Sequence, residues 1–244
     1  MEQENIIQVN ELTKKFGDFV AVKGISFEVK KGEIFGFLGA NGAGKTTAMK
    51  MLIGISKPTS GMAIVAGLNV AQSANEVKKN IGYMSQKFSL YDDLTIKENI
   101  RFFGGIYGLK PKTIQEKTID LIQRLELEKV ADERVGQLPL GWKQKLAFSV
   151  ALLHEPKIVF LDEPTGGVDP VTRRQFWEMI GEEAHNGTTI FVTTHYMDEA
   201  EYCNRVSIMV DGKIEALDTP KKLKEQFKVS SMNDVFLKLA RNIE

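Results

Sequence analysis

The stretch from residue 34 to residue 47 combines an apolar run, glycines, a lysine and threonines in an order suited to binding phosphate. The residues that fit the spacing of a phosphate-binding loop are Gly39, Gly44, Lys45 and Thr46. The glycines let the backbone turn tightly and bring its N–H groups near an anion. A helix beginning at Lys45 adds its positive end. The stretch therefore predicts a buried strand at 34–38, a polyphosphate cradle and a helix, unless the spacing is a glycine-rich turn that matches by chance.

Two adjacent carboxylates follow a second apolar run. Residues 158–161 are Ile-Val-Phe-Leu, a pattern typical of a strand buried on both faces of a parallel sheet, and Asp162 and Glu163 come next. Ligands of parallel sheets lie beyond the carboxyl ends of the strands. There Asp162 suits a Mg²⁺ contact, and Glu163 suits a general base that polarises an attacking water. The alternative is a strand that simply ends in solvated acids, which is rarer for two acids than for one.

Single polar residues end two further expected strands. Gln86 follows a strand expected at 81–85, and His195 follows one expected at 188–194. Gln86 could hold Mg²⁺ or a water near the phosphates, although by itself it is more often an ordinary loop residue. A lone histidine is usually structural, but His195 is expected at the same sheet edge as the phosphate loop and the two acids.

Composition narrows the class of protein. The chain has 244 residues, enough for one large domain or two small ones, with 43% hydrophobic and 26% charged residues. Lysine plus arginine equals aspartate plus glutamate at 32 each, so the charge favours neither nucleic acid nor an anionic membrane. The single cysteine, Cys203, excludes an intramolecular disulfide and fits a reducing compartment.

The chain carries no visible targeting or spanning segment. Its start, Met-Glu-Gln-Glu-Asn, lacks the basic and apolar pattern of a signal peptide. No apolar run approaches the ~18 residues needed to cross a bilayer. We therefore expect any membrane role to come through a partner.

The N-terminal part predicts two short strands, at 6–9 and 25–29, with a turn at 14–18 between them. Phe16 lies on that turn, a short way before the phosphate loop. An aromatic ring there could stack on a nucleobase. Taken alone, a core or hairpin-packing phenylalanine is the more common case.

The middle of the chain predicts a helical block. Apolar residues recur at helical spacing over 95–109 and 112–125, and Thr95 with Glu98 fits a capping box. We expect this block to interrupt an α/β core. Its aromatic residues are either core or a docking surface for another subunit; they are Phe88, Tyr91, Phe102, Phe103 and Tyr107.

The remainder predicts further α/β elements. Pro139 suits the entry of a helix expected over 143–153, and Asp169 before Pro170 suits the N-cap of a helix ending near 183. Asp211 and Gly212 predict a hairpin turn between strands at 205–210 and 213–216. The charged tail from residue 220 is expected to be helical, with 234–239 packing back on the body.

The order of these motifs resembles the nucleotide-binding subunit of ATP-binding cassette (ABC) transporters, over about residues 5 to 217. The resemblance implies an α/β fold: a RecA-like P-loop NTPase core with a mostly parallel sheet, an N-terminal antiparallel β subdomain and a helical insertion subdomain. It implies a cassette over 1–220, with the helical subdomain at about 88–155, and a helical tail over 221–244. Two segments, residues 138–142 and the tail residues 234–239, resemble the branch of the family that exports drugs, lipids or polysaccharides.

The family pattern also assigns roles to matching positions. It implies that Lys45, Glu163 and His195 are catalytic, with Glu163 as base and His195 on the γ-phosphate. The implied nucleotide-binding residues are Phe16, Gly39, Ala40, Asn41, Gly42, Ala43, Gly44, Lys45, Thr46, Thr47 and Gln86. The implied Mg²⁺ contacts are Thr46, Gln86 and Asp162.

One segment departs from the family pattern. The usual signature is Leu-Ser-Gly-Gly-Gln, which in a head-to-tail dimer faces the ATP of the other cassette. This chain has Leu138, Pro139, Leu140, Gly141 and Trp142 at those positions. The loop Gly167-Val168-Asp169 is also altered, although Asp169 remains to cross to the other subunit. These changes leave open how tightly two cassettes would bind ATP between them. They do not put the fold in question.

The resemblance implies an ATPase that uses ATP and Mg²⁺ to drive export through separate transmembrane permease subunits. Its other partner is a second cassette, either a copy or a relative, and nucleic acid is not expected. The expected location is peripheral, on the cytoplasmic face of the cell membrane. Two alternatives remain open: a soluble cassette ATPase, and an ATP-binding switch that hydrolyses weakly because of its signature.

Overall fold

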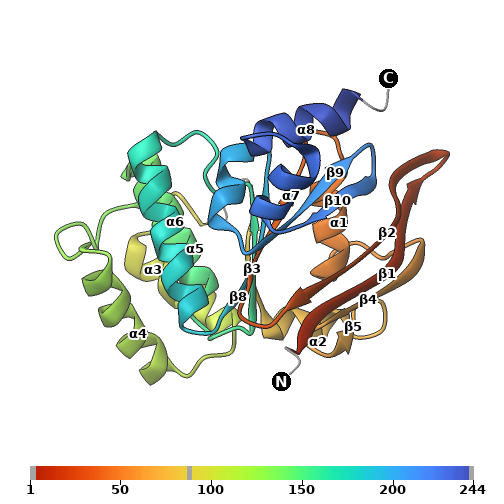
Figure 1. The fold of residues 1–244 in the computed structure, drawn as a ribbon. Helices are drawn as coiled ribbons and strands as arrows, with labels where there is room; N and C mark the ends of the chain where they lie inside the picture. Colours follow the sequence, from red (N-terminus) through yellow and green to blue (C-terminus); the bar gives the residue numbers. More distant parts are fainter. Residues whose placement is uncertain (1–3, 87–89, 242–244) are drawn as a thin grey trace.

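The computed structural model describes residues 4–86 and 90–241, which form two β-sheets surrounded by helices (Figure 1). The smaller sheet is antiparallel, with strand order β2-β1-β4-β5. Its strands are β1 (Asn5–Phe16), β2 (Phe19–Lys30), β4 (Ser60–Val65) and β5 (Leu68–Asn69). This sheet is the antiparallel β unit that the sequence predicted.

The larger sheet has strand order β10-β9-β3-β8-β7-β6, and all its neighbours pair in parallel except β9 and β10. The predicted α/β architecture with a mostly parallel sheet is confirmed. Its strands are β3 (Ile34–Leu38), β6 (Ile81–Met84), β7 (Ile158–Asp162), β8 (Thr189–Thr194), β9 (Arg205–Val210) and β10 (Lys213–Asp218).

The helices follow from caps and apolar stripes. Thr95 and Glu98 form the predicted capping box, and Asp169 caps the helix that begins at Pro170. The helices are α1 (Lys45–Leu52), α2 (Ala74–Asn80), α3 (Ile96–Ile106), α4 (Pro111–Arg124), α5 (Leu140–Ala151), α6 (Pro170–His185), α7 (Pro220–Phe227) and α8 (Met232–Arg241). Two 3₁₀ segments are η1 (Val135–Gln137) and η2 (Met197–Tyr202).

Several predicted bounds need correction. The strand β1 continues through Phe16, so the turn is confined to Gly17 and Asp18 instead of 14–18. The helix α5 begins at Leu140, not at 143, because Pro139 already serves as its N-cap. The short elements α2 and β5 were not predicted, since they are too short to show a period.

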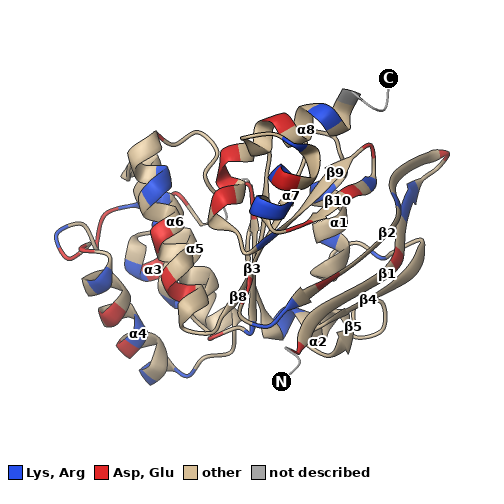
Figure 2. Ribbon diagram, viewed as in Figure 1, with Lys and Arg blue, Asp and Glu red and all other residues tan. Residues whose placement is uncertain are grey.

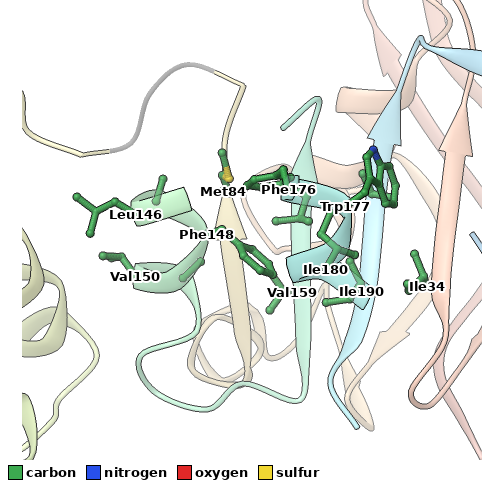
Figure 3. Packing of buried hydrophobic residues seen from close by; sticks show 14 of the residues in the cluster. Ile34, Met84, Leu146, Phe148, Val150, Val159, Phe176, Trp177, Ile180 and Ile190 are labelled. Carbon is green, nitrogen blue, oxygen red and sulfur yellow. The ribbon is translucent and has the colours of Figure 1, made fainter. Parts of the chain in front are cut away.

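The central strands β3, β7 and β8 of the larger sheet are buried along their whole length, whereas β10 at its edge is not. Phe35 and Phe37 face the antiparallel sheet, where their rings lie 5.6 Å and 5.5 Å from that of Phe27. Ile34 and Leu38 face the opposite way, toward α5 and α6. Figure 3 shows this second layer, with side chains of the two helices packed on Val159 and Ile190. The two layers hold the strand ends rigidly.

The outer helices are charged and the helical block keeps some aromatic surface. Lysines, arginines and acids share α4 and α7 (Figure 2). Tyr91 and Phe102 are exposed, whereas Phe103 and Tyr107 pack against the core. Phe88, and with it the predicted start of the helical subdomain, lies outside the described residues.

The tail packs back as predicted, because Val235 and Leu239 of α8 are buried in the core. Within residues 4–86 and 90–241, each helix falls short of the length and apolar character that a membrane crossing requires.

Candidate active site

The strand order brings the predicted site residues to one edge of the larger sheet. The phosphate loop leaves β3, His195 follows β8, Asp162 ends β7 and Gln86 follows β6. These four strands are neighbours in the order β3-β8-β7-β6, and they run in parallel. Their carboxyl ends therefore line one cleft edge, where parallel sheets hold ligands.

Close backbone approaches explain two glycines of the loop. A Cβ on Gly39 would lie 2.3 Å from the carbonyl oxygen of Met209, and one on Gly44 would lie 2.5 Å from that of Ala21. Gly44 also has φ of +103°, which side chains disfavour, and it caps the helix α1. The loop is thus wedged between β2 and β9, with the start of α1 directed at the cleft.

Lys45 is almost fully buried beneath this loop. Its Nζ donates to the carbonyl oxygens of Gly39 at 2.8 Å and Ala40 at 3.0 Å, and it lies 3.5 Å from Oε1 of Glu163. Burial lowers the pKa of Lys45, while the negative charge of Glu163 opposes that shift. The two hydrogen-bond acceptors of the ammonium are therefore uncharged backbone oxygens, which the charged oxygens of a polyphosphate could replace.

Asp162 joins the phosphate loop to β8. Its Oδ1 accepts from the hydroxyl of Thr46 at 3.1 Å and from that of Thr193 at 2.6 Å. Burial, reinforced by the charge of Asp162, raises the pKa of Tyr83 to about 12. In the described part of the chain, no group of three His, Cys, Asp or Glu side chains could enclose a metal ion. One carboxylate beside one hydroxyl does fit Mg²⁺, which takes few protein ligands and completes its shell with water and phosphate oxygens.

Glu163 stands at the centre of the polar contacts. One of its oxygens, Oε2, contacts Nε2 of Gln86 at 2.9 Å and Nδ1 of His195 at 3.0 Å. Its backbone has φ of +49°, a strained conformation for a glutamate. The N–H of Glu163 donates to the backbone oxygen of Thr193 at 3.0 Å and to its hydroxyl at 3.1 Å, which holds that conformation.

Phe16 is not a core residue, so of the two commonplace alternatives only packing within the hairpin remains beside base stacking. Its side chain is 55% exposed at the end of β1, and the Lys14 ammonium lies 5.1 Å from the ring centroid. Phe16 pairs with Phe19, two residues before Ala21, whose oxygen approaches Gly44. A strand rises ~3.3 Å per residue, so the Phe16–Phe19 pair lies ~7 Å from the phosphate loop along β2.

The signature segment forms the beginning of α5 against α6. Leu138 is buried, whereas Leu140 is 44% exposed. The segment lines a cavity of about 320 Å³ together with the 167–169 loop. Leu140 also lines a second cavity of about 260 Å³ with Gln86 and Glu163. Leu140 of the signature segment thus lies at the surface and reaches the edge of the sheet where Gln86 and Glu163 lie.

The carboxylate of Asp169 caps the N-terminus of α6 with both of its oxygens. Its carboxylate accepts from the backbone N–H groups of Val171 and Thr172 at 3.0 Å each, and from the Thr172 hydroxyl at 2.5 Å. These bonds, with the Thr172 hydroxyl first, lower the pKa of Asp169. The carboxylate is also exposed, so a second molecule could reach it.

Two site residues were missed by the sequence reasoning. Thr193 bonds both Asp162 and the backbone of Glu163, and Gln144 of α5 donates to the oxygen of Gly166 at 3.3 Å. Thr193 and Thr194 precede His195, so the polar end of that strand was a usable signal. Nothing in the sequence around Gln144 separates it from an ordinary helical glutamine.

Comparisons with known proteins agree with this geometry. The family model described as "ABC transporter" matches residues 22–166. The chain is 51% identical over 223 residues to the probable multidrug ABC transporter ATP-binding protein YbhF of Escherichia coli (strain K12). That match covers 91% of this chain and 39% of that protein, so the chain spans about two-fifths of the length of this relative.

A second relative matches over more of its own length. The Nod factor export ATP-binding protein I of Burkholderia lata is 38% identical over 220 residues, which cover 90% of this chain and 72% of that protein. Among solved structures, an ATP-binding subunit of an ABC transporter has a TM-score of 0.85 at 26% identity, covering 96% of this chain and 99% of the other. A dimeric ATP-binding cassette in a post-hydrolysis state, bound to ADP and Pi, has a TM-score of 0.77 at 26% identity, covering 87% and 98%.

Proposed function

The chain belongs to the ABC transporter family, and from this we propose that it is an ATPase subunit that powers export through separate membrane-spanning subunits. The observation that carries the proposal is the position of Glu163. This buried carboxylate touches the phosphate-loop lysine, Gln86 and His195 at once, at 3.5, 2.9 and 3.0 Å. A side chain in that position can act on whatever Lys45 binds.

Nucleotide binding would use the loop, the helix end and the ring of Phe16. Polyphosphate oxygens would replace the carbonyl oxygens of Gly39 and Ala40 as acceptors of Lys45 Nζ, and would take the amides of residues 39–47. Thr46 and Asp162 would hold Mg²⁺, with Gln86 as a further contact. When bound, Mg²⁺ neutralises the charge that develops on the β- and γ-phosphate oxygens.

Hydrolysis would depend on Glu163 as general base. An attacking water within hydrogen-bond reach of Oε1 would lose its proton to that carboxylate. Gln86 and His195 hold the other oxygen, Oε2, and so fix the plane of the carboxylate. His195 would in addition contact the γ-phosphate.

We further propose that the working unit is a head-to-tail dimer of cassettes, with each signature facing the ATP of the other. Pro139 to Trp142 and Asp169 would supply the facing surface, because they line one cavity, with Leu138 buried beneath them. Support comes from the dimeric cassette among the similar structures. Closure on ATP would drive transport, and hydrolysis would reset it.

The partners and location follow from the same proposal. One relative is named as a probable multidrug ABC transporter protein and another as a Nod factor export protein, which supports the export branch. Transmembrane permease subunits would hold the protein at the cytoplasmic face of the membrane. Within the chain, we propose a cassette over 1–220 with its helical subdomain at about 88–155, and a tail over 221–244.

A phosphate-release assay on the purified protein with Mg²⁺ and ATP tests the proposal. We expect turnover that falls by ~10²–10⁴ in Glu163→Gln, with nucleotide binding kept. Binding without turnover in the wild-type protein would instead favour the switch, which the variant signature makes the second candidate. Co-purification with membrane subunits, followed by mass spectrometry, tests the transport role.

A further inference from the structure

A second buried carboxylate, Glu199, lies behind the site. It has no exposed surface, and it belongs to the 3₁₀ segment η2. Its Oε1 accepts from the hydroxyl of Thr165 at 2.5 Å, and its Oε2 accepts from the hydroxyl of Thr194 at 2.5 Å. One oxygen is thus bonded to the loop after β7, and the other is bonded to the last residue of β8, directly before the loop that follows that strand.

These two loops carry the two proposed catalytic groups. Thr165 lies two residues after Glu163, and Thr194 immediately precedes His195. The Thr194 hydroxyl also accepts from the N–H of Tyr196 at 3.0 Å, so it fixes the backbone on both sides of the histidine. Glu199 therefore forms a side-chain bridge between the loop after β7 and the loop after β8.

The loop after β7 needs such an anchor. Glu163 has φ of +49°, a conformation that is unfavourable for a non-glycine residue and persists only where neighbours enforce it. The N–H of Gly166 closes the loop by donating to the oxygen of Glu163 at 3.2 Å. Thr165 lies inside that turn, so its hydroxyl is the point at which Glu199 holds it.

Arg173 of α6 supplies the balancing charge. Its Nε lies 3.7 Å from Oε1 of Glu199, and its guanidinium carbon lies 4.1 Å from the ring centroid of Tyr196. The rings of Tyr196 and His195 are 4.2 Å apart. A buried carboxylate is costly unless it is paired and hydrogen-bonded, and Glu199 is both.

We propose that Glu199 is a positioning residue for ATP hydrolysis: through Thr165 and Thr194 it sets the distance between Glu163 and His195. This inference rests on the proposed function, because it needs Glu163 and His195 to act on ATP. Glu199 itself has no exposed surface, and its two oxygens bond Thr165 and Thr194 instead of any residue assigned to nucleotide binding. Its loss should therefore lower kcat and leave the affinity for ATP unchanged.

The test compares isosteric variants that remove one bond at a time. Thr165→Val and Thr194→Val each delete a hydroxyl, and Glu199→Gln replaces one accepting oxygen with an NH₂ group. We expect each to lower kcat ~10-fold or more, with the dissociation constant of a fluorescent ATP analogue within ~2-fold of the wild type. Thr165→Ser, which keeps the hydroxyl, should recover most of the rate.

Glu33→Gln is the matched control. Glu33 is also buried and ion-paired, at 2.6 Å from Arg205, but it lies at the opposite end of β3 from the phosphate loop. We expect Glu33→Gln to lower the melting temperature without changing kcat of the folded protein. Equal kcat losses in this control and in Glu199→Gln would reduce Glu199 to a structural role and overturn the proposal.

A double variant separates this inference from the proposed function. In the Glu163→Gln background, Glu199→Gln should cause no further loss of rate, because the group it positions is gone. Independent, multiplying losses would overturn the positioning role. A wild-type protein without ATP turnover would overturn the proposed function. An active wild type whose Thr165→Val and Thr194→Val variants are equally active would overturn this inference alone.

Discussion

Gly141 of the signature segment and Thr172 of α6 are in such close contact that a Cβ on Gly141 would lie 2.4 Å from Cγ2 of Thr172. The signature keeps its glycine for packing within the chain, independently of any second cassette. We expect Gly141→Ala to lower the free energy of unfolding by about 1–3 kcal/mol, the usual cost of overpacking. Denaturant unfolding of the purified protein measures this.

Thr172→Ser offers a specific rescue of that variant. Serine removes the colliding methyl group and keeps the hydroxyl that donates to Asp169 at 2.5 Å. The double variant should therefore recover most of the lost stability. A Gly141→Ala protein as stable as the wild type would show that α5 and α6 can separate freely at this point.

Lys45→Ala should weaken nucleotide binding beyond the micromolar range. Lys45 Nζ donates two hydrogen bonds to backbone oxygens of the phosphate loop, and phosphate oxygens would accept these bonds when nucleotide is bound. Hydrogen bonds to charged groups contribute ~1.5–3 kcal/mol each, so the loss of two such bonds lowers the affinity by ~10²–10⁴. Titration calorimetry with ATP measures the loss. Lys50→Ala, an exposed lysine of the same helix, should bind like the wild type. Micromolar affinity in the Lys45 variant would contradict the assignment.

Glu163→Gln should keep ATP binding and slow hydrolysis by ~10²–10⁴, the usual contribution of a positioned general base. An ATP-bound dimer should accumulate, because the closed state can no longer decay. Phosphate release and size-exclusion chromatography read out the two effects. Glu155→Gln is the control, since Glu155 also has positive φ, at +53°, but pairs with Lys117 on the surface. Unchanged turnover in Glu163→Gln would shift the role of base to His195.

Phe16→Ala should weaken ATP more than inorganic triphosphate, because stacking acts on the base and not on the phosphates. Loss of one stacked base is worth ~1–3 kcal/mol. Phe19, the cross-strand neighbour of Phe16, is 66% exposed and provides the control. Competition binding with both ligands decides the matter: equal losses for ATP and triphosphate would mean that the ring only stiffens the hairpin.

Replacing Pro139 by serine and Leu140 by glycine should strengthen ATP-driven dimerisation in the Glu163→Gln background. Proline offers neither a hydroxyl nor an N–H, and two lost bonds to a phosphate oxygen at ~1.5–3 kcal/mol each would weaken closure by ~10²–10⁴-fold. Analytical ultracentrifugation with ATP measures the dimer. The control Pro139→Ala with Leu140→Ala restores the N–H but not the hydroxyl, so it should gain less than the serine and glycine variant. No gain in the first variant would mean that the N-terminus of α5 already holds the phosphate by another geometry.

The sequence predicted most of the fold because each central strand is a mostly apolar run that stops at a glycine or a polar residue. That pattern placed β3, β7 and β8 within a residue of their ends, together with Asp162, Glu163 and His195. The short helix α2 was not predicted, because Val77 is its one buried residue and the helix therefore has no apolar stripe. The true length of β1 was not predicted, because Lys14 and Lys15 near its end are polar and resemble the start of a turn.

Two features of the site could not be predicted, for a physical reason. Glutamate is seldom fully buried, so nothing local marks Glu199 as an interior residue. Its partners are Thr165 on the loop after β7 and Thr194 at the end of β8, and only the pairing of β7 with β8 brings them together. The exposure of Phe16 could not be predicted either, because phenylalanine is usually buried.

The two neighbours of β3 in the larger sheet, β8 and β9, both come from the last quarter of the chain. The phosphate loop at residues 39–47 is therefore made early during synthesis but has no flanking strands until the ribosome has passed Val210. Such distant pairing is slow and leaves apolar strands unpaired in the meantime. Competence to bind nucleotide thus comes late in biogenesis, and a chain that stops before β8 carries the loop without the sheet that shapes it.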